Sequence, residues 1–421
     1  MVPIRILHIN TNDLDGGAAR AAYRLHKGLI DQGIDSIFLS KQNSIKDKYS
    51  CTIRGKKNKV FILFNLYIER LLLGLFNLKK KNVWSFSDGI DCITSLINEL
   101  DVDIVHLHWI NQGFLPIQAL KKINKPIIWT LHDSWVFTAG CHIPYLCEKY
   151  KKECYCCEQF SGNRFFDFSK YSFRKKFKEY KANMTIVCPS NWLGECAKQS
   201  FLLKNNDIRI ISNGINIENY QPRNRAFSRG ILGIENSNKV ILFGAMSAVS
   251  DVNKGFEYLN KAMEIIYKNN KNERIEILVF GSNEPKEAPN FGFKTTYIGR
   301  LYDDISLNIL YSVADVMVVP SKSESFGQTA LEALASGTPC VAFKCTGLVD
   351  IIKHKVNGYL AHPYNPEDLA AGIEYVIKNG KEWMKLSENA RRIVSNNFDI
   401  KNISEKYIKL YEEVLRKSND K

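Results

Sequence analysis

The feature that most constrains the fold of this chain is an alternation of short apolar runs with helix-length segments, which occurs twice along the sequence. In the first half the apolar runs lie at residues 4–9, 36–40, 102–107, 126–131 and 184–189, and in the second half at 239–244, 274–281, 295–299, 315–320 and 339–343. Continuous apolar runs of this length, separated by helices, are typical of parallel strands buried on both faces of a sheet. The sequence therefore predicts an α/β fold with two doubly wound, Rossmann-like domains.

The length of 421 residues exceeds what a single hydrophobic core usually organises, which also favours two domains. Residues 213–238 contain Pro222, several Asn and Arg residues and no strong apolar period, so we expect the interdomain linker there. The expected domains are 1–212 and 239–394, facing each other across a ligand-binding cleft. Apolar residues at helical spacing near 395–417 predict a last helix that packs back on the first domain.

The charge of the chain points to an anionic partner. Lys and Arg number 58 against 44 Asp and Glu, which gives a net charge of +14. No RNP-type strand or Cys/His finger spacing stands out, so nucleic acid is not expected as a partner. The opening MVPIRILHIN resembles a buried strand rather than a signal peptide, and the cysteines form no evenly spaced framework. These features predict a cytoplasmic protein with reduced thiols.

Residues 60–78 (VFILFNLYIERLLLGLFNL) are unusually apolar and have lysines on both sides. As a helix, the segment places Asn65, Glu69, Arg70 and Asn77 within an arc of about 140°, which leaves a wide apolar face. Its internal charges argue against a membrane-spanning helix. Two alternatives remain: a helix that lies on an anionic membrane surface, and a buried helix of the first domain. The aromatic and basic run at 164–181 has a similar character.

Residues 141–157 (CHIPYLCEKYKKECYCC) concentrate five cysteines together with His142. Cys141, Cys147, Cys154 and either Cys156 or Cys157 supply enough thiols for a structural zinc site, although the spacing matches no established zinc motif. A cluster of reduced thiols and a set of disulfides are the alternatives. None of them implies a catalytic role.

The most specific motif, SKSESFGQTALEA at 321–333, directly follows the predicted strand at 315–320. Glu324 lies in the loop at the carboxyl end of this strand, where open α/β sheets bind ligands. A helix is predicted to begin near Gly327, and the first backbone N–H groups of a helix can receive a phosphate. Glu332, one to two turns further on, can accept hydrogen bonds from both hydroxyls of a ribose.

Two glutamates separated by seven residues and followed by ALASGTP resemble the signature of the retaining, family-four glycosyltransferases, which have the GT-B fold. The resemblance extends over essentially the whole chain. It implies that Glu332 binds the ribose of the donor nucleotide and that Glu324 lies near the transferred sugar. It further implies that the backbone amides of Phe326 and Gly327 support that sugar and the diphosphate.

Residues 240–255 (VILFGAMSAVSDVNKG) resemble the strand and loop of this family that end in a Lys-Gly pair, which implies that Lys254 neutralises the donor diphosphate. An arginine usually found a few residues upstream is replaced here by Ala, Met and Ser, so a second cation is unassigned. The YIGR segment at 297–300 is similar to the family segment whose backbone reads the nucleotide base, which implies this role for Ile298 and Gly299.

In the first half, Gly16 and Gly17 precede a helix after the first strand, where small residues let the backbone approach phosphate groups. Their Gly-Gly-Ala-Ala order departs from the three-glycine fingerprint of dinucleotide enzymes. His132 follows the strand at 126–131, where the family has a histidine that touches the donor sugar. His108 is a weaker candidate.

The resemblance implies a reaction without a metal or other cofactor. The nucleoside diphosphate leaves the anomeric carbon, an oxocarbenium-like state develops, and the acceptor hydroxyl attacks from the same face. The catalytic candidates are then Glu324, His132 and Lys254. The aspartate pairs Asp13/Asp15 and Asp101/Asp103 lack the context of a metal-binding DxD motif and are interpreted as loop residues.

The two basic, apolar segments favour a lipid-linked acceptor, which we expect to be a polyprenyl-diphosphate oligosaccharide of surface polysaccharide assembly, such as exopolysaccharide or O-antigen. The protein is then expected on the inner face of the cell membrane as a peripheral protein. A sugar-nucleotide epimerase of the same fold is one alternative, because it binds the same donor but needs no acceptor surface. A catalytically silent binding subunit is another, and the missing arginine motivates it.

Overall fold

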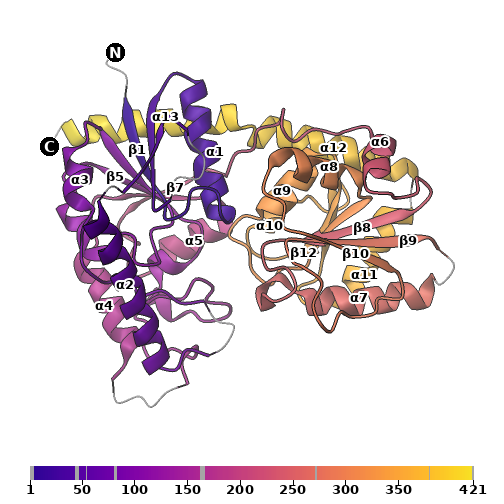
Figure 1. Ribbon diagram of the computed structural model, residues 1–421, viewed down its shortest axis with the longest axis horizontal. Coiled ribbons are helices and arrows are strands. Elements are labelled where there is room, and N and C mark those ends of the chain that lie inside the picture. Colours follow the sequence, from indigo (N-terminus) through magenta and orange to yellow (C-terminus); the bar gives the residue numbers. More distant parts are fainter. Residues whose placement is uncertain are drawn as a thin grey trace. The chain divides into compact units, whose positions relative to one another are not determined.

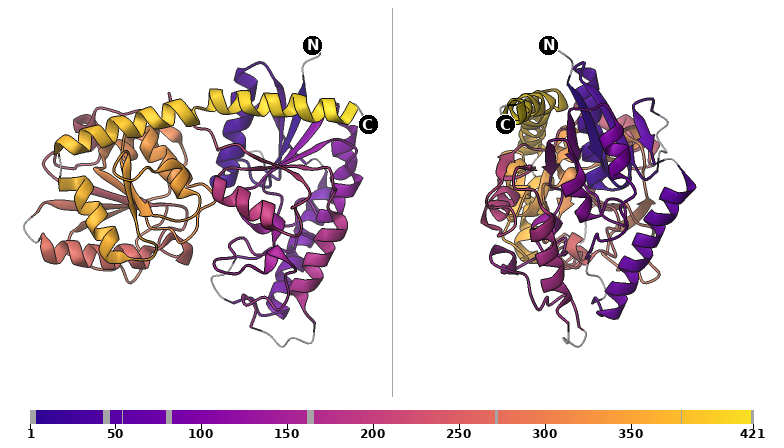
Figure 2. Two further views of the ribbon diagram at one scale, coloured as in Figure 1. Left: turned by 180° about the vertical axis from the view of Figure 1, so that it is seen from behind. Right: turned by 90° about the vertical axis from the view of Figure 1, so that its left-hand side faces the viewer.

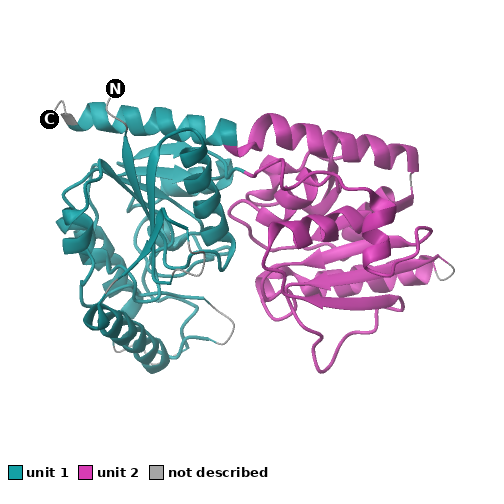
Figure 3. Cartoon of the chain, turned by 45° about the horizontal axis from the view of Figure 1, so that its top comes forward, with its two compact units in different colours: residues 1–214, 401–421 teal, residues 215–400 magenta. Residues whose placement is uncertain are grey.

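The computed structural model describes residues 4–42, 47–53, 55–79, 83–161, 166–270, 273–378 and 380–419. The chain divides into two compact units (Figure 3). Unit 1 comprises Met1–Gly214 and Lys401–Lys421, and unit 2 comprises Ile215–Ile400. Each unit contains one parallel sheet, as the alternating apolar runs predict.

The sheet of unit 1 has seven parallel strands in the order β3-β2-β1-β4-β5-β6-β7. Strands β1, β5 and β7 of this sheet are labelled in Figure 1. The strands are β1 (Arg5–Ile9), β2 (Asp35–Ser40), β3 (Ser50–Thr52), β4 (Ile104–Leu107), β5 (Ile127–Thr130), β6 (Thr185–Cys188) and β7 (Asp207–Ile210). The α-helices are α1 (Gly17–Asp31), α2 (Lys56–Leu75), α3 (Thr94–Glu99), α4 (Phe168–Glu179), α5 (Asn191–Gln199) and α13 (Ile400–Asn419). Short 3-10 turns lie at Ile117–Lys122, Trp135–Phe137 and Lys149–Lys151.

Side chains of successive strand residues point to opposite faces of this sheet, and each face has its own core. Ile6, Ile104 and Ile128 pack with α1 and with Tyr407 and Tyr411 of α13. The opposite face packs against the remaining apolar side chains of the unit in a separate cluster. Helix α13, the last of the chain, therefore completes the core of unit 1, and Figure 2 shows it running along this unit.

The sheet of unit 2 has six parallel strands in the order β10-β9-β8-β11-β12-β13. The strands are β8 (Lys239–Gly244), β9 (Ile275–Phe280), β10 (Lys294–Gly299), β11 (Val316–Val319), β12 (Cys340–Phe343) and β13 (Gly358–Ala361). The helices are α6 (Arg225–Ile231), α7 (Phe256–Asn269), α8 (Asp304–Val313), α9 (Gln328–Ala335), α10 (Leu348–Ile351), α11 (Pro366–Lys378) and α12 (Gly380–Phe398), with a 3-10 turn at Val252–Lys254. Two apolar clusters, one with α7 and α11 and one with α8, α9 and α12, cover the two faces.

The expected linker at 213–238 differs from the structure, because the chain belongs to unit 2 from Ile215 onwards. This segment contains α6, whose Arg229 is buried and donates from Nη2 to Asp315 Oδ2 at 3.0 Å. Asp315 also accepts a hydrogen bond from the backbone N–H of Val240 at 2.6 Å. The segment is folded onto unit 2 through buried polar groups, which an apolar pattern does not reveal.

Helix α2 buries Asn65 and Glu69 together with Ile62, and it exposes much of its apolar side. Asn65 Oδ1 accepts a hydrogen bond from the Ile90 N–H at 2.8 Å, and Glu69 Oε2 accepts one from the Ser87 N–H at 3.2 Å. Apolar side chains on the other side are exposed, among them Val60 (60%), Leu63 (58%), Tyr67 (63%) and Leu75 (66%). The alternative of a buried helix is therefore wrong for the apolar face of α2. In the described part of the chain, no helix combines the length and the apolar character that crossing a membrane requires.

Candidate active site

The sheet of unit 2 has a point where its strand order reverses, and the candidate residues gather there. From β8 the chain proceeds to β9 and β10 on one side, and from β11 to β12 and β13 on the other. Open α/β sheets bind ligands at the carboxyl ends of the strands that flank such a reversal. Here the flanking loops are residues 245–255 after β8 and 320–327 after β11.

Lys254 and Glu324 come from these two loops and form an ion pair. Lys254 Nζ lies 2.8 Å from Glu324 Oε1, and the side chains are 20% and 17% exposed. Burial alone would lower the pKa of Lys254, but the Glu324 carboxylate outweighs it, with a further contribution from Asp251, and the pKa is raised above its ordinary value. Lys254 is thus a fixed positive charge that solvent still reaches, as an anion-binding group must be.

Two hydrogen bonds of Asn253 join the two loops. Its side chain donates from Nδ2 to Ser323 O at 2.8 Å, and its backbone carbonyl accepts from the Lys322 N–H at 2.8 Å. The next residue, Gly255, has φ +69°, and a Cβ built on it would lie 1.9 Å from Pro320 O. Only glycine fits between the loops at this position. The close contact fixes the lysine loop against the glutamate loop.

The glutamate loop continues into α9 through another constrained glycine. Gly327 precedes Gln328–Ala335 with φ +106°, and a Cβ on it would lie 2.6 Å from Leu348 Cδ2. Phe326 is 1% exposed and packs with its ring on Phe398. The backbone of the loop is therefore fixed at the start of α9. The first N–H groups of this helix point toward its N-terminal end, where the loop lies.

Glu332 lies on α9 and is only 3% exposed. The hydroxyl of Tyr311, on α8, donates to Glu332 Oε2 at 2.8 Å. The carboxylate is thereby held in one orientation at the inner side of the helix. The two glutamates of the motif have different hydrogen-bond donors: Glu324 is paired with the Lys254 ammonium, and Glu332 accepts from the neutral Tyr311 hydroxyl.

A cavity of about 510 Å³ opens at the carboxyl ends of β8, β9 and β10. It is lined by Ser247, Val249, Ser250, Gly281, Ser282, Asn283, Pro285, Arg300 and Tyr302. Ile298 is the extra residue of a bulge in the β9–β10 register, and the Gly281 N–H donates to Gly299 O at 2.7 Å. Bulges of this kind locally end strand pairing next to binding sites.

In unit 1 the strand order reverses between β1 and β4. Gly16, with φ +96°, directly precedes α1, which begins at Gly17 after the β1 loop. His132 follows β5 and is bonded through Nε2 to His108 Nδ1 at 3.1 Å. The glycines and the histidine thus follow strands at the carboxyl edge of this sheet, as the sequence predicts for a ligand-binding edge.

Asp133, next to His132, is the centre of a network that sequence reasoning missed. His142 Nδ1 lies 2.6 Å from Asp133 Oδ2, and Trp109 Nε1 donates to the same oxygen at 3.0 Å. Burial alone would raise the pKa of Asp133, but the hydrogen bonds and the nearby His142 lower it below its ordinary value. The loop after β5 is therefore anchored by a carboxylate, which the sequence HD alone does not reveal.

The cysteine segment brings several thiols near Cys141 without bonding them to one another. All cysteines are free thiols, so the disulfide alternative is wrong here. Burial, followed by the neighbouring Cys157, Cys154 and Cys147, raises the pKa of Cys141. Among the residues that the structure describes, the only group of three potential ligands with donor atoms within 4.8 Å of one another is His8, His106 and His108. A zinc site of Cys141, Cys147, Cys154 and Cys157, or Cys156 in place of Cys157, stays a prediction.

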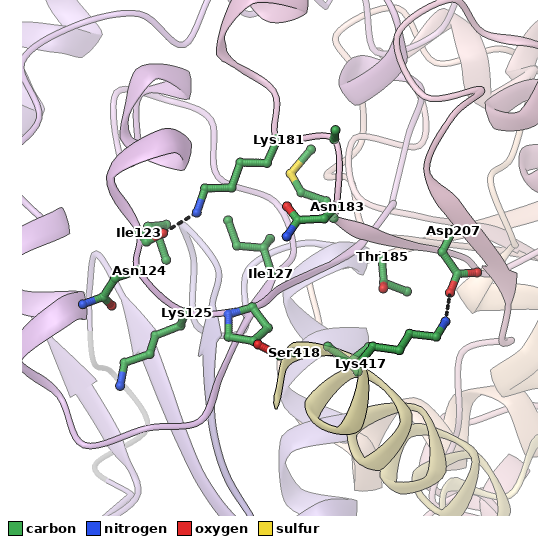
Figure 4. Close-up of a pocket in the computed structure, with 14 residues that line it drawn as sticks. Ile123, Asn124, Lys125, Ile127, Lys181, Asn183, Thr185, Asp207, Lys417 and Ser418 are labelled. Carbon is green, nitrogen blue, oxygen red and sulfur yellow. Dashed lines mark hydrogen bonds and ion pairs between the residues drawn. The ribbon is translucent and has the colours of Figure 1, made fainter. Parts of the chain in front are cut away.

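A cavity of about 510 Å³ in unit 1 lies where the strands of the sheet begin, at the end opposite to the one that carries Gly16 and His132 (Figure 4). Its lining includes the segments before β5 and β6 and the end of α13, where Lys417 Nζ pairs with Asp207 Oδ2 at 3.1 Å. It thus lies at the amino ends of the strands. Catalytic loops of α/β sheets follow the carboxyl ends, so we assign this cavity no part in the reaction.

Comparison with known families decides the class of protein. The model of "Glycosyltransferase Family 4" matches residues 15–219, and the model of "Glycosyl transferases group 1" matches residues 224–393. Together they extend over both units. The chain belongs to the family-four glycosyltransferases. Both models describe transferases, so this glycosyltransferase is an enzyme of sugar transfer, and the epimerase alternative lacks support.

Two relatives match this glycosyltransferase over most of its length. An uncharacterised glycosyltransferase of Methanocaldococcus jannaschii is 27% identical over 332 residues, which cover 73% of the chain and 82% of the relative. Sulfoquinovosyl transferase SQD2 of Arabidopsis thaliana is 27% identical over 316 residues, which cover 73% of the chain and 56% of the relative. The first relative's name specifies no sugar and the second's names sulfoquinovosyl transfer by that protein, so the sugar and the acceptor of this enzyme stay open.

Solved structures share its fold. Sucrose-phosphate synthase from Thermosynechococcus elongatus has a TM-score of 0.70 at 20% identity and is covered to 99%, with 98% of this chain. Anabaena Alr3699/HepE in complex with UDP-glucose has a TM-score of 0.65 at 15% identity and is covered to 100%, with 97% of this chain. The fold of this glycosyltransferase is therefore GT-B, with a Rossmann-like sheet in each unit.

Proposed function

We propose that this enzyme transfers a sugar, with retention of configuration, from a nucleoside-diphosphate sugar to a saccharide acceptor, and that unit 2 holds the donor. The observation that carries the proposal is the Lys254–Glu324 pair, 2.8 Å apart at the reversal of strand order. A diphosphate competes with Glu324 for the Lys254 ammonium and gains a charge-assisted hydrogen bond.

Each part of the donor is assigned to a different group of residues in unit 2. The diphosphate lies between Lys254 and the first N–H groups of α9, while the nucleoside occupies the cavity near Ile298 and Gly299. Glu332, oriented by Tyr311, accepts the ribose hydroxyls. Arg300, which lines the cavity, supplies a cation in a chain that lacks the family's upstream arginine.

The chemical step needs little covalent participation from the protein. The bond between the anomeric carbon and the diphosphate oxygen breaks, and both its electrons leave with the diphosphate. The acceptor oxygen then bonds to that carbon on the same face and gives its proton to the leaving diphosphate. Lys254 and the α9 amides stabilise the negative charge that develops, and such preorganised groups account for most of the rate gain.

For the acceptor, we propose a lipid-linked saccharide, reached from an anionic membrane surface. The support is the outward apolar face of α2, because solvent-exposed Leu and Tyr side chains in one row are costly unless something covers them. Lys56, Lys57 and Lys59 at the start of α2 are exposed and attract anionic head groups. In the second basic run, Phe166 and Phe177 are exposed near the ends of α4, whereas Arg164 lies outside the described residues.

The membrane proposal predicts that the purified protein sediments with vesicles containing phosphatidylglycerol and much less with pure phosphatidylcholine vesicles. The double substitution Leu63→Ser/Leu71→Ser is expected to weaken binding at least about 10-fold, since each leucine gains up to about 1.5–3 kcal/mol on full burial. Ile305→Ser is the matched control, because Ile305 is 66% exposed but belongs to unit 2 and not to α2. Equal binding by all three proteins contradicts the proposal.

Transfer itself is tested by release of nucleoside diphosphate when the enzyme receives a panel of nucleotide sugars and an extract of lipid-linked oligosaccharides. We expect release to require both substrates and the new glycosidic bond to keep the anomeric configuration of the donor. An inverted linkage contradicts the retaining mechanism. Absence of release with every donor in a folded protein favours the silent binding subunit.

A further inference from the structure

Three histidines form a continuous hydrogen-bonded line through unit 1, which the proposed chemistry does not use. His8 Nδ1 lies 2.9 Å from His108 Nε2, and His108 Nδ1 lies 3.1 Å from His132 Nε2. His8 and His108 are buried, with 0% and 3% exposure, whereas His132 is partly exposed. The line therefore runs from the middle of the sheet to its ligand-binding edge.

Strand alternation places these rings on one face. In register, His8 of β1 lies opposite His106 of β4, so the side chains at 8, 106 and 108 share the face covered by α1 and α13. His132 follows β5 by the same period of two, after Thr130. Neighbouring strands thus supply successive members of the line.

The number of ring protons limits how the three histidines can hydrogen bond to one another. Burial lowers the pKa of His8 and His108 well below the usual range and that of His132 to about 4, so each ring is neutral at neutral pH with one N–H. Each contact between two neutral rings needs one N–H and one lone pair. The tautomer of each ring therefore depends on that of its neighbour.

His8, at the buried end of the line, determines which ring of each pair is the hydrogen-bond donor. His8 Nε2 is buried and has no hydrogen-bond partner within the described chain. Because a buried N–H without a partner is rarer and costlier than a buried lone pair without one, the proton of His8 belongs on Nδ1. His8 then donates to His108 Nε2, and His108 donates from Nδ1 to His132 Nε2.

We propose that His8 and His108 are positioning residues that hold His132 as the neutral tautomer with its proton on Nδ1. His132 then meets a hydroxyl of the transferred sugar as a hydrogen-bond donor and not as a base, a role that rests on the proposed function. The tautomer itself does not depend on that function.

A metal site at His8, His106 and His108 is the competing interpretation of the same cluster. His106 has both ring nitrogens engaged, Nδ1 with the Tyr411 hydroxyl at 2.8 Å and Nε2 with the Thr130 hydroxyl at 2.8 Å. Metal binding would break these bonds and the His8–His108 bond. The hydrogen-bonded line accounts for the observed contacts without such a loss.

The first test is the ¹⁵N spectrum of the wild-type protein labelled in its histidine rings, with His132 assigned through His132→Gln. The proposal predicts a protonated Nδ1 and a bare Nε2 for His132 without any substrate present. A protonated Nε2, or a mixture of both forms, overturns it. This measurement needs no active enzyme, so its failure is distinct from a failure of the proposed transfer.

A variant series tests the coupling. His8→Phe removes the inner donor, and we expect a mixed tautomer at His132 and a fall in kcat of about 10-fold with little change in KM. His8→Asn keeps an N–H near the former Nδ1 and is expected to recover most of both. His26→Phe is the control, because His26 is equally buried beside His8 but bonds to Ser36 outside the line. An unchanged His132 spectrum in folded His8→Phe contradicts the coupling.

Discussion

Lys254→Ala is expected to lower kcat/KM for sugar transfer by about 10²–10³-fold, the usual effect of removing one preorganised group that stabilises transition-state charge. The substitution removes the positive charge proposed to hold the leaving diphosphate. It also leaves Glu324, whose side chain is 17% exposed, without its 2.8 Å partner, so that the empty site repels an anionic donor. Steady-state kinetics with varied donor concentration measure the effect.

The control for this substitution is Lys378→Ala. Lys378 also forms a 2.8 Å ion pair with a glutamate of unit 2, Glu374, but on the surface of α11. A surface pair of this kind contributes little to stability, and its loss is expected to leave kcat/KM within about two-fold of the wild type. Similar kinetic losses in both variants would show that the role assigned to Lys254 is wrong.

Gly255→Ala is expected to destabilise unit 2 by about 3–5 kcal/mol, because the new methyl group meets the Pro320 carbonyl and the backbone keeps a left-handed conformation. The built Cβ lies 1.9 Å from Pro320 O at φ +69°. Relief of the clash moves the loop of Lys254 away from the loop of Glu324, so activity should fall together with stability. Urea unfolding followed by circular dichroism measures the change.

Gly233→Ala separates the clash from the backbone conformation. Gly233 has φ +64°, nearly the same as Gly255, but a Cβ there meets nothing within 4 Å. Its expected cost is only the left-handed penalty of about 1–2 kcal/mol. If the two alanine variants lose the same stability and Gly255→Ala keeps its activity, the loops are not held together as described.

Much of the fold could be predicted because strands of a parallel sheet are buried on both faces and therefore consist of continuous apolar runs. Each of the ten predicted runs overlaps a strand of the structure. The missed strands β3, β7 and β13 are short and lie at sheet edges, where partial exposure weakens the apolar pattern. Helix α6 was not predicted because a buried ion pair, Arg229 with Asp315, holds it on unit 2. Charged residues are usually exposed, so their presence in the sequence suggested a surface linker.

The candidate site could be predicted where the chemistry is local in sequence. Glu324 and Lys254 both follow strands, and strand order brings their loops together, although they are 70 residues apart. The tertiary partners were not predictable in this way, because Tyr311 reaches Glu332 from another helix and His142 reaches Asp133 from the cysteine segment. One signal in the sequence was not used: His106 on β4 and His108 just after it are two residues apart and share a face with His8.

The central claim, that unit 2 binds a nucleotide sugar through the motif at 321–333, is tested most directly by thermal unfolding with a panel of nucleotide sugars. A donor at 100 times its dissociation constant adds about 2.7 kcal/mol, which raises the Tm of a unit of this size by about 5–10 °C. The account predicts such a shift for one donor and its loss in Glu332→Ala. No shift with any nucleotide sugar or nucleoside diphosphate, or a shift that Glu332→Ala retains in full, would contradict it.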